Sequence, residues 1–375
     1  MTLVLGFGLL LLFLLLVYAF FFIKVLAGLH QPTSPLPRQP AEMVSIIIAV
    51  RNEESTIGAC LDSILAQEYP TESCEIIVVD DGSSDSTRTI IDQLHQSHPR
   101  IRLVGRSEES AVGNKRTALM AGIKEAKGDI LLFTDGDCTV KPGWIRAMTD
   151  SLRAPICFVA GPVVEAGEPG FLQKLSRLEF LGIIGVAAGL LRAGNPIFCN
   201  GANIAYRKTA FEGIGGFGPD AHFSDDEIIL QRFFLRNKNS VAFTLEPDAI
   251  VATKSPPSLK SFWHQRVRWS SKTGVYENKL ILVRLVALYL FFITLLCSIV
   301  VSLQFPSLLA AVIPALALKL LLDWLVIHKT AALLHQSISF LHLFIAEVFH
   351  VPYIVLAALQ GQIGSLRWKG APVRT

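Results

Sequence analysis

Two aspartates one residue apart, Asp135 and Asp137, follow directly after a short apolar run, residues 130–133. Such a run between Gly128 and Gly136 is typical of a buried strand. Carboxylates at the carboxyl end of a parallel strand can face a ligand held at that edge of the sheet. Their oxygens suit Mg2+ or Mn2+, and these ions suit a diphosphate. A simple polar turn is the alternative, because Asp and Gly end many strands.

A second acidic turn comes earlier in the chain. The strand-like run at residues 75–79 leads into Asp80 and Asp81 and then into the start of a polar helix. These side chains can hydrogen-bond a base or a ribose, while the N-terminus of the helix favours phosphate. An ordinary strand-to-helix turn is again the alternative. No GxGxxG follows the first strand, where AVRNEE stands instead, which argues against a dinucleotide-binding fold.

The elements that must position these residues alternate between strand and helix. This alternation between Val44 and about Thr253 predicts a parallel, nucleotide-binding α/β sheet. The expected strands are residues 44–50, 75–79, 100–104 and 130–133. The expected helices are residues 53–67, 85–95 and 115–126.

The composition places part of the chain in a membrane. Of the 375 residues, 51% are hydrophobic and 17% are charged, and the mean hydropathy of +0.47 is too high for an ordinary soluble enzyme. The apolar segments are residues 3–29, 280–303, 308–327 and 338–359. The net charge of +3 and the lack of a basic run make nucleic acid a poor partner. The six cysteines form no CxxC pair and no zinc-like spacing, so we assign them no chemistry and expect a reducing compartment.

The first apolar segment has no basic n-region and no cleavage site, so we expect a retained anchor at residues 1–29. A stiff proline-rich linker follows at residues 30–43. Lys24 and Arg38 flank the inner end of the anchor, which predicts that the globular domain faces the cytoplasm. We therefore expect a multi-pass protein of a bacterial-type cytoplasmic (inner) membrane.

The last apolar segment contains ionisable residues and is interrupted by Pro352. Three full spans after a cytoplasmic domain would place the basic tail, residues 361–375, outside, against the positive-inside rule. Either this bias is broken here, or the last segment, residues 338–359, is a re-entrant or interfacial pair of half-helices, and we favour the second. Glu347 and His350 are candidates for lining a lipid-acceptor groove, and burial between helices is the alternative.

Seven motifs in order resemble the family 2 glycosyltransferases with a GT-A fold, in particular the membrane-embedded group that includes cellulose, chitin and hyaluronan synthases and many bacterial lipid glycosyltransferases. The motifs are AVRNEE, VVDDGSSDST, GNKRTALMAG, DILLFTDGDC, FCNGANIAYR, SDDE and QRVRW. The resemblance implies an α/β, Rossmann-like GT-A domain at residues 44–254 with N- and C-terminal transmembrane helices. It also implies an interfacial helix with the QxxRW motif at residues 255–279 and membrane segments at residues 280–360.

The resemblance assigns roles to individual residues. Those that match the family's nucleotide site are Glu53, Asp80, Asp81, Lys115 and Asp135. Asp135 and Asp137 match its metal-binding pair, which implies a metal-dependent hexosyltransferase. The divalent ion, Mg2+ or Mn2+, would act as a Lewis acid on the departing UDP.

The residues on the acceptor side follow later in the chain. An inverting transfer needs a carboxylate opposite the leaving diphosphate to take the proton of the acceptor hydroxyl. The resemblance makes Asp226 the first choice for this base and Asp225 the second, because SDDE departs from the commoner ED and GDD forms. The alternative is a plain helix start capped by Ser224. The residues that resemble the family's acceptor-side strand and loop are Asn200, Gly201 and Asn203.

Gln265, Arg268 and Trp269 match the family's QxxRW motif. In the family the Trp ring stacks on the acceptor and the Arg faces the diphosphate. Residues 258–272 are also basic and aromatic, as in a helix at the membrane surface. A further helix at residues 171–192 is either a second interfacial helix or a core helix of the domain.

These observations favour a membrane-bound inverting glycosyltransferase that moves a sugar from a UDP-sugar to a lipid or lipid-linked acceptor. A processive polysaccharide synthase is one alternative, since it shares QRVRW, but the membrane portion is small for a secretion channel. A non-catalytic GT-A-like scaffold is the other, and the intact Asp137, Asp226 and QRVRW argue against it. The motifs identify neither the sugar nor the acceptor.

Overall fold

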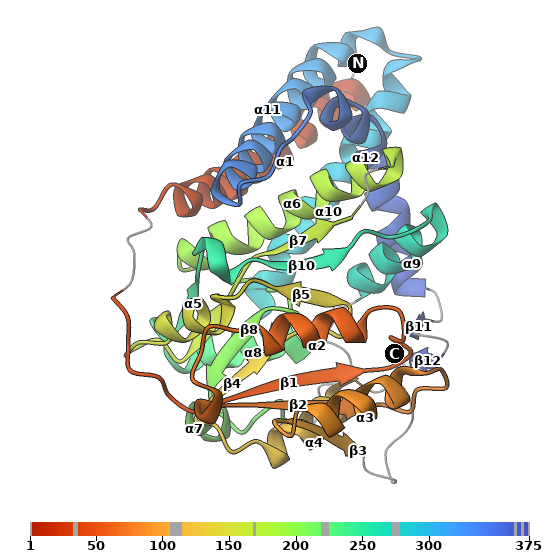
Figure 1. The fold of residues 1–375 in the computed structure, drawn as a ribbon. Helices are drawn as coiled ribbons and strands as arrows, with labels where there is room; N and C mark the ends of the chain where they lie inside the picture. Colours follow the sequence, from red (N-terminus) through yellow and green to blue (C-terminus); the bar gives the residue numbers. More distant parts are fainter. Residues whose placement is uncertain are drawn as a thin grey trace. The chain divides into compact units, whose positions relative to one another are not determined.

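The computed structural model describes residues 2–32, 37–105, 115–167, 170–218, 225–271, 278–363, 366–368 and 371–373. These residues form two compact units, each with its own core (Figure 1). The α/β unit comprises Pro32–Gly167, Phe198–Lys254 and Ser365–Thr375. The helical unit comprises Met1–Gln31, Glu168–Ile197 and Ser255–Gly364.

Within the described ranges, the α/β unit is built on a seven-stranded sheet of order β3-β2-β1-β4-β8-β6-β9. Its parallel half consists of β1 (Val44–Val50), β2 (Cys74–Asp80), β3 (Ile101–Gly105) and β4 (Ile130–Phe133). These are the four predicted strands, to within one residue at each end. Nearly every residue of β1, β2 and β4 is buried, as continuous apolar runs in a parallel sheet predict.

The other half of this sheet was not expected from the alternation of strands and helices, although the resemblance indicated a strand and loop in FCNGANIAYR. It consists of β8 (Ile204–Arg207), β6 (Phe158–Ala160) and β9 (Val241–Phe243), with β8 antiparallel to both β4 and β6. A second sheet contains β5 (Cys138–Val140), β10 (Val251–Lys254) and β7 (Val163–Ala166). Strands of three or four residues are too short to show a period that distinguishes them from loops.

Helices cover the sheet at the positions that the sequence indicates. The three predicted helices are α2 (Ile57–Leu65), α3 (Thr87–Ser97) and α4 (Lys115–Glu125). The remaining described helices of the unit are α5 (Trp144–Asp150), α7 (Lys208–Gly213) and α8 (Asp225–Arg236). Tyr206 of β8 stacks on Phe133 with ring centroids 4.9 Å apart and on Phe211 at 5.2 Å, which joins strand and helix in one core.

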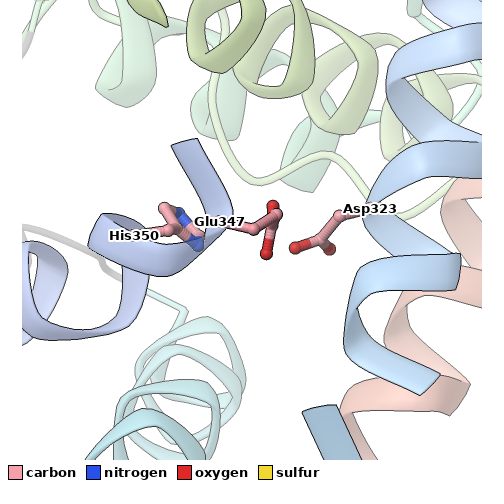
Figure 2. Close-up of side chains that lie close together, drawn as sticks. All are labelled: Asp323, Glu347 and His350. Atoms are coloured by element: carbon pink, nitrogen blue, oxygen red, sulfur yellow. The ribbon is translucent and has the colours of Figure 1, made fainter. Parts of the chain in front are cut away.

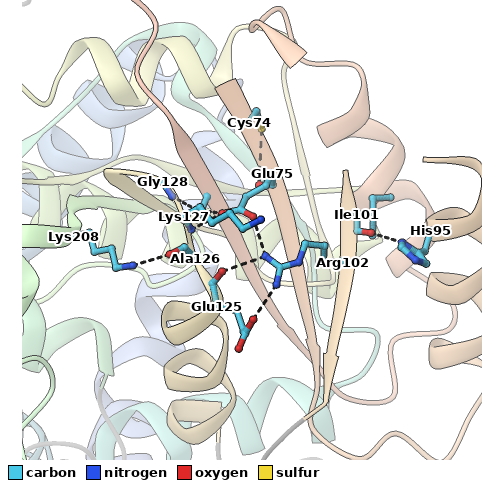
Figure 3. Close-up of polar contacts among 11 residues, drawn as sticks. Cys74, Glu75, His95, Ile101, Arg102, Glu125, Ala126, Lys127, Gly128 and Lys208 are labelled. Carbon is cyan, nitrogen blue, oxygen red and sulfur yellow. Dashed lines mark hydrogen bonds and ion pairs between the residues drawn. The ribbon is translucent and has the colours of Figure 1, made fainter. Parts of the chain in front are cut away.

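A buried carboxylate, Glu75, holds the amino ends of the parallel strands together (Figure 3). It accepts hydrogen bonds from Ser45 Oγ at 2.6 Å, from Lys127 N at 2.6 Å and from Arg102 at 3.1 Å. Arg102 also pairs with Glu125 at 2.9 Å. Burial acts to raise the pKa of Glu75, but these hydrogen bonds outweigh it and the net pKa is lowered. The network therefore fixes the edge of the sheet opposite the carboxyl ends of the strands.

Among the described residues of the helical unit, four helices are long and apolar enough to cross a membrane. They are α1 (Thr2–Leu29), α10 (Lys279–Ser302), α11 (Leu309–Leu333, preceded by a 3-10 turn, Pro306–Leu308) and α12 (Phe340–Ile363). All four coincide with the predicted apolar segments. The expectation of two half-helices in the last segment is wrong, because α12 continues through Pro352.

The long helix α6 (Phe171–Arg192) belongs to the helical unit, so it is not a core helix of the α/β domain. It packs closely on α1 at Gly189, where a Cβ atom would lie 2.4 Å from Val25 O. Arg192 then donates to Gly28 O at 3.0 Å. Glycine at the crossing thus permits backbone contact between the two helices.

Candidate functional site

The predicted site residues of the α/β unit come together at the carboxyl edge of the parallel strands. Val50 at the end of β1 is paired with Asp80 at the end of β2. On the other side of β1, Ile47 is paired with Phe133 at the end of β4, and Phe133 faces Ile204 at the start of antiparallel β8. The loops after β1, β2 and β4 and before β8 therefore share one edge, the usual ligand-binding edge of such sheets (Figure 1).

Asp80 and Asp81, the predicted nucleoside residues, are both buried at this edge. Asp80 Oδ1 accepts a hydrogen bond from Ser83 N at 3.0 Å. Asp81 N donates to Val50 O at 2.9 Å, which continues the β1–β2 pairing by one residue. The turn is thus fixed by its own backbone before any ligand arrives.

The loops after β1 and β2 are interlocked by residues that the sequence did not single out. Asn52 has a positive φ of 53°, and its Oδ1 accepts from Ser84 N at 2.8 Å. Thr87 Oγ1 accepts from Glu53 N at 2.7 Å and donates to Asp85 at 2.6 Å. Burial acts to raise the pKa of Asp85, but hydrogen bonds from Thr87 and from backbone N–H groups together outweigh it, so the pKa lies below its ordinary value. The signal was present in AVRNEE, since Asn is among the few residues that tolerate a positive φ.

The metal-type motif lies against the end of β1. A Cβ atom on Gly136 would approach Val50 Cγ1 to 2.8 Å and Glu53 Cγ to 3.3 Å, so the turn between Asp135 and Asp137 has room only for glycine. Lys115 Nζ lies 2.5 Å from Asp135 Oδ1. The structure therefore brings together two residues that the resemblance had assigned to neighbouring roles.

The carboxylates of Asp137, Asp135 and Glu53 all act electrostatically on the buried thiol of Cys60, so they share one region of the unit. Burial raises the pKa of Cys60, and the negative charges of Asp137, Asp135 and Glu53 raise it further. Cys60 Sγ also lies 3.5 Å from Asp135 O. Close carboxylates repel one another unless a cation compensates them. Their hard oxygens fit a divalent ion such as Mg2+ or Mn2+, and Lys115 supplies a positive charge at the same place.

Asp226, the first choice for the base, lies in the first turn of α8 and contacts the loop before β8. Its Oδ2 accepts from Gly201 N at 2.9 Å and its Oδ1 from Glu227 N at 3.0 Å. A Cβ atom on Gly201 would lie 3.2 Å from Asp226 Cβ, so this glycine makes room for the carboxylate. Ser224 and the side chain of Asp225 lie outside the described residues.

Asn203, which the resemblance placed on the acceptor side, has a structural role. It is fully buried and accepts from Trp144 Nε1 at 2.9 Å. Its amide donates to Pro162 O at 2.8 Å and to Ala249 O at 2.7 Å. Asn203 therefore ties the start of β8 to the segments that lead into β7 and β10.

The QxxRW residues Gln265, Arg268 and Trp269 lie on α9 (Leu259–Ser270) in the helical unit, whereas the carboxylates lie in the α/β unit. The helix starts with a capping box between Ser258 and Ser261. It packs on the end of α12, where Trp263 Nε1 donates to Gln360 at 2.7 Å. The predicted surface helix is thus anchored to an apolar helix.

All six cysteines, each within the described ranges, are free thiols. Burial raises the pKa of Cys138, and the carboxylates of Asp137 and Asp135 raise it further. A thiol with a raised pKa is a poor nucleophile at neutral pH.

Glu347 and His350, the ionisable candidates of the last segment, lie close to Asp323 of α11 (Figure 2). The fully buried Lys319 contacts all three, with Nζ 2.8 Å from Asp323, 3.1 Å from His350 Nδ1, and hydrogen-bonded to Glu347. Tyr18 of α1 donates to Asp323. Asp323, Glu347 and His350 have donor atoms within 4.8 Å of one another, as in a metal site. The Lys319 ammonium already supplies the cation there, which favours burial between helices over an acceptor groove.

Lys319→Met is expected to destabilise the helical unit strongly. The change leaves the buried Asp323 and the partly buried Glu347 without their cation, and breaking a buried ion pair in this way costs about 3–5 kcal/mol. The measurement is thermal unfolding of the full chain in lipid nanodiscs. Lys329→Met, at a less buried lysine of the same helix, is the matched control. Equal unfolding temperatures for the two variants would contradict the interpretation of Lys319 as the compensating charge.

Comparison with known proteins places this chain among the glycosyltransferases. The model of the family described as glycosyl transferase family 2 matches residues 45–215. The chain is 29% identical over 257 residues to an N-acetylglucosaminyltransferase of Rhizobium meliloti (strain 1021), a match that covers 64% of this chain and 57% of that protein. It is 27% identical over 252 residues to a beta-monoglucosyldiacylglycerol synthase of Synechocystis sp., covering 64% and 49%. The chain thus spans about half the length of these curated relatives.

One solved structure shares the fold over nearly the whole chain. It is a mannosyltransferase from Pyrobaculum calidifontis in complex with GDP-Man and Mn2+, with a TM-score of 0.60, 19% identity, and coverage of 96% of this chain and 97% of that one. Residues 45–215, which the family model matches, contain β1 to β4 and β8. They also contain Asp80, Asp81, Lys115, Asp135 and Asp137. This chain therefore carries a glycosyl transferase family 2 domain with the GT-A fold at residues 45–215.

Proposed function

We propose that this chain is a membrane-bound inverting glycosyltransferase that moves a sugar from a UDP-sugar to a lipid or lipid-linked acceptor at the cytoplasmic face of the membrane. The observation that carries the proposal is the set of residues at one edge of the sheet. Buried Asp80 and Asp81, the Lys115–Asp135 pair, and Asp226, which contacts the loop before β8, all lie at that edge. The four apolar helices support the membrane location.

On the donor side, Asp80 and Asp81 would accept hydrogen bonds from the nucleoside, and Lys115 would neutralise phosphate charge. Asp135 and Asp137 would hold Mg2+ or Mn2+, which when bound acts as a Lewis acid toward the departing diphosphate. Gly136 keeps these two carboxylates close to Glu53 at the end of β1. The chain thus supplies separate groups for the nucleoside and for the diphosphate.

On the acceptor side, Asp226 would take the proton of the attacking hydroxyl. Backbone N–H groups of Gly201 and Glu227 orient its two oxygens. Each carboxylate oxygen has two lone pairs, so the one not used by the backbone can accept the acceptor's O–H. Attack on the anomeric carbon opposite the leaving diphosphate inverts its configuration.

A lipid acceptor is supported by the helical unit. Its surface helix α9 is basic and aromatic and is packed on α12, as expected for a helix at the headgroup level. The similarity to a beta-monoglucosyldiacylglycerol synthase supports a lipid as the acceptor class. Lys24 and Arg38 support a cytoplasmic active site by the positive-inside rule.

Transfer from a panel of labelled donors tests the proposal. Membranes with the full chain are incubated with UDP-glucose, UDP-N-acetylglucosamine and GDP-mannose, and Asp226→Asn membranes serve as the control. We expect label from a UDP-sugar in solvent-extractable lipid. Label in insoluble polymer would instead identify a processive synthase. Donor binding without transfer to either product would identify a non-catalytic scaffold.

Trp269→Ala is expected to damage acceptor use more than donor use. The indole offers a flat apolar face for a sugar ring or acyl chain, while Asp80, Asp81 and Asp137 still bind the donor. The expected result is a raised acceptor KM or lost transfer, with UDP affinity and slow donor hydrolysis preserved. If a folded variant loses UDP binding in proportion to transfer, Trp269 belongs to the donor pocket.

A further inference from the structure

Arg266, the second residue of QRVRW, is a buried cation bound to α6. Its side chain is 4% exposed. Its Nε lies 2.9 Å and its second terminal nitrogen 2.7 Å from Glu179 Oε2, and the same group reaches Ser176 Oγ at 3.4 Å. A buried charge is stable only when it is paired in this way. Arg266 and Glu179 therefore fix α9 to α6 within the helical unit.

The same guanidinium also contacts two residues of the QxxRW motif. Its other terminal nitrogen donates to Gln265 Oε1 at 2.6 Å. Its central carbon lies 4.5 Å from the centre of the Trp269 ring and 4.4 Å from that of Phe262. One planar group thus binds a carboxylate and an amide through its edges and two aromatic rings through its faces.

This arrangement leaves Gln265 and Trp269 with defined orientations. Gln265 is held through its carbonyl oxygen, and the Trp269 ring contacts both Arg266 and Phe180, whose ring centre is 6.0 Å away. Lysine could not make the same contacts, because a single ammonium has neither the planar face nor the fork of donors.

We propose that Arg266 is a positioning residue that sets the orientation of Gln265 and Trp269 through its ion pair with Glu179. The inference rests on the proposed function in one respect, namely that Gln265 and Trp269 serve the acceptor. Arg266 itself contacts neither substrate in this scheme. Because Arg266 is bound to Glu179 of α6, it holds the side chains of Gln265 and Trp269 in one orientation relative to that helix.

The first test is spectroscopic and needs no substrate. The full chain, labelled with 5-fluorotryptophan, is placed in phosphatidylcholine nanodiscs, and Trp269→Phe assigns the Trp269 signal in the 19F NMR spectrum. Arg266→Gln and Arg266→Lys are each expected to shift or broaden the Trp269 signal and to leave Trp144 and Trp324 unchanged. Lys260→Gln, at an exposed lysine of the same helix, is the matched control and should change nothing. An unchanged Trp269 signal in Arg266→Gln would overturn the proposal.

A charge swap separates positioning from simple linkage of the two helices. Glu179→Arg combined with Arg266→Glu restores an ion pair between α6 and α9 but places no cation on the Trp269 ring. We expect the swap to regain thermal stability relative to Arg266→Gln and to keep the altered Trp269 signal. If the signal returns to that of the wild type, Arg266 only links the helices and the proposal is wrong.

Transfer to endogenous membrane lipid gives the functional readout. Arg266→Gln is expected to lower transfer about tenfold, the scale of one lost cation–π contact and one hydrogen bond. UDP affinity is expected to stay within about twofold of the wild-type value, because Arg266 acts on the acceptor side and not on the donor side. Wild-type transfer with no loss in Arg266→Gln overturns the positioning role. If wild-type membranes transfer nothing, the proposed function fails, and the 19F spectra still decide whether Arg266 orients Trp269.

Discussion

Asp226→Asn is expected to lower glycosyl transfer by about a hundredfold to ten-thousandfold, the usual contribution of a general base. The amide cannot take up the proton of the acceptor hydroxyl. Its oxygen can still accept one of the two backbone hydrogen bonds that orient Asp226, so the loop before β8 should keep its conformation. The measurements are the transfer rate with labelled donor and UDP affinity by calorimetry. We expect UDP affinity to stay the same, because a base acts in the transition state and not in holding the nucleotide.

Asp225→Asn is the matched control for this prediction. It removes the neighbouring carboxylate, which SDDE leaves as the second choice for the base. An inactive Asp225→Asn with an active Asp226→Asn would move the base by one residue. If both variants keep full turnover, the base lies elsewhere in the chain.

The sequence predicted the parallel half of the sheet and its acidic edge because their signals are local. Continuous apolar runs ending in Asp and Gly specify buried strands and the turns after them. Once β1, β2 and β4 are parallel neighbours, their carboxyl ends must share an edge. Asp80 and Asp135 therefore lie at the same edge of the sheet.

The sequence could not predict the contacts that depend on segments far apart in the chain. The pairing of Lys115 with Asp135 and the use of Gly201 to admit Asp226 arise only from tertiary packing. The role of Arg266 was missed for the same reason, since its partner Glu179 lies on another helix. Nothing in the sequence around QRVRW indicates that Arg266 contacts Glu179.

The half-helix expectation for the last segment failed because it relied on a single proline. Pro352 removes one backbone hydrogen bond, and apolar helices tolerate this when neighbouring groups compensate locally. The polar residues nearby suggested exposure to a lipid groove. Instead, the partly buried Glu347 and His350 contact the buried Lys319, so their polarity is compensated inside the helical unit.

Removal of divalent cations is expected to abolish transfer. Mg2+ or Mn2+ as a Lewis acid contributes several kcal/mol to the transition state, about a thousandfold or more in rate. The measurement is transfer, with UDP affinity, in chelator and after Mg2+ or Mn2+ is restored. Full turnover in chelator, or equal UDP affinity with and without the ion, would rule out the metal role.

The two aspartates of the motif should differ when they are changed one at a time. Asp137→Asn replaces a charged carboxylate ligand by a neutral amide. We therefore expect Mn2+ to increase UDP affinity less in this variant than in the wild type. Asp135→Asn also releases Lys115 from its ion pair, and the freed ammonium can then bind the diphosphate directly. We therefore expect Asp135→Asn to bind UDP more tightly than Asp137→Asn does in chelator, although both lose transfer. The reverse order of affinities would show that Lys115 does not reach the phosphates and that its contact with Asp135 serves only to stabilise the turn.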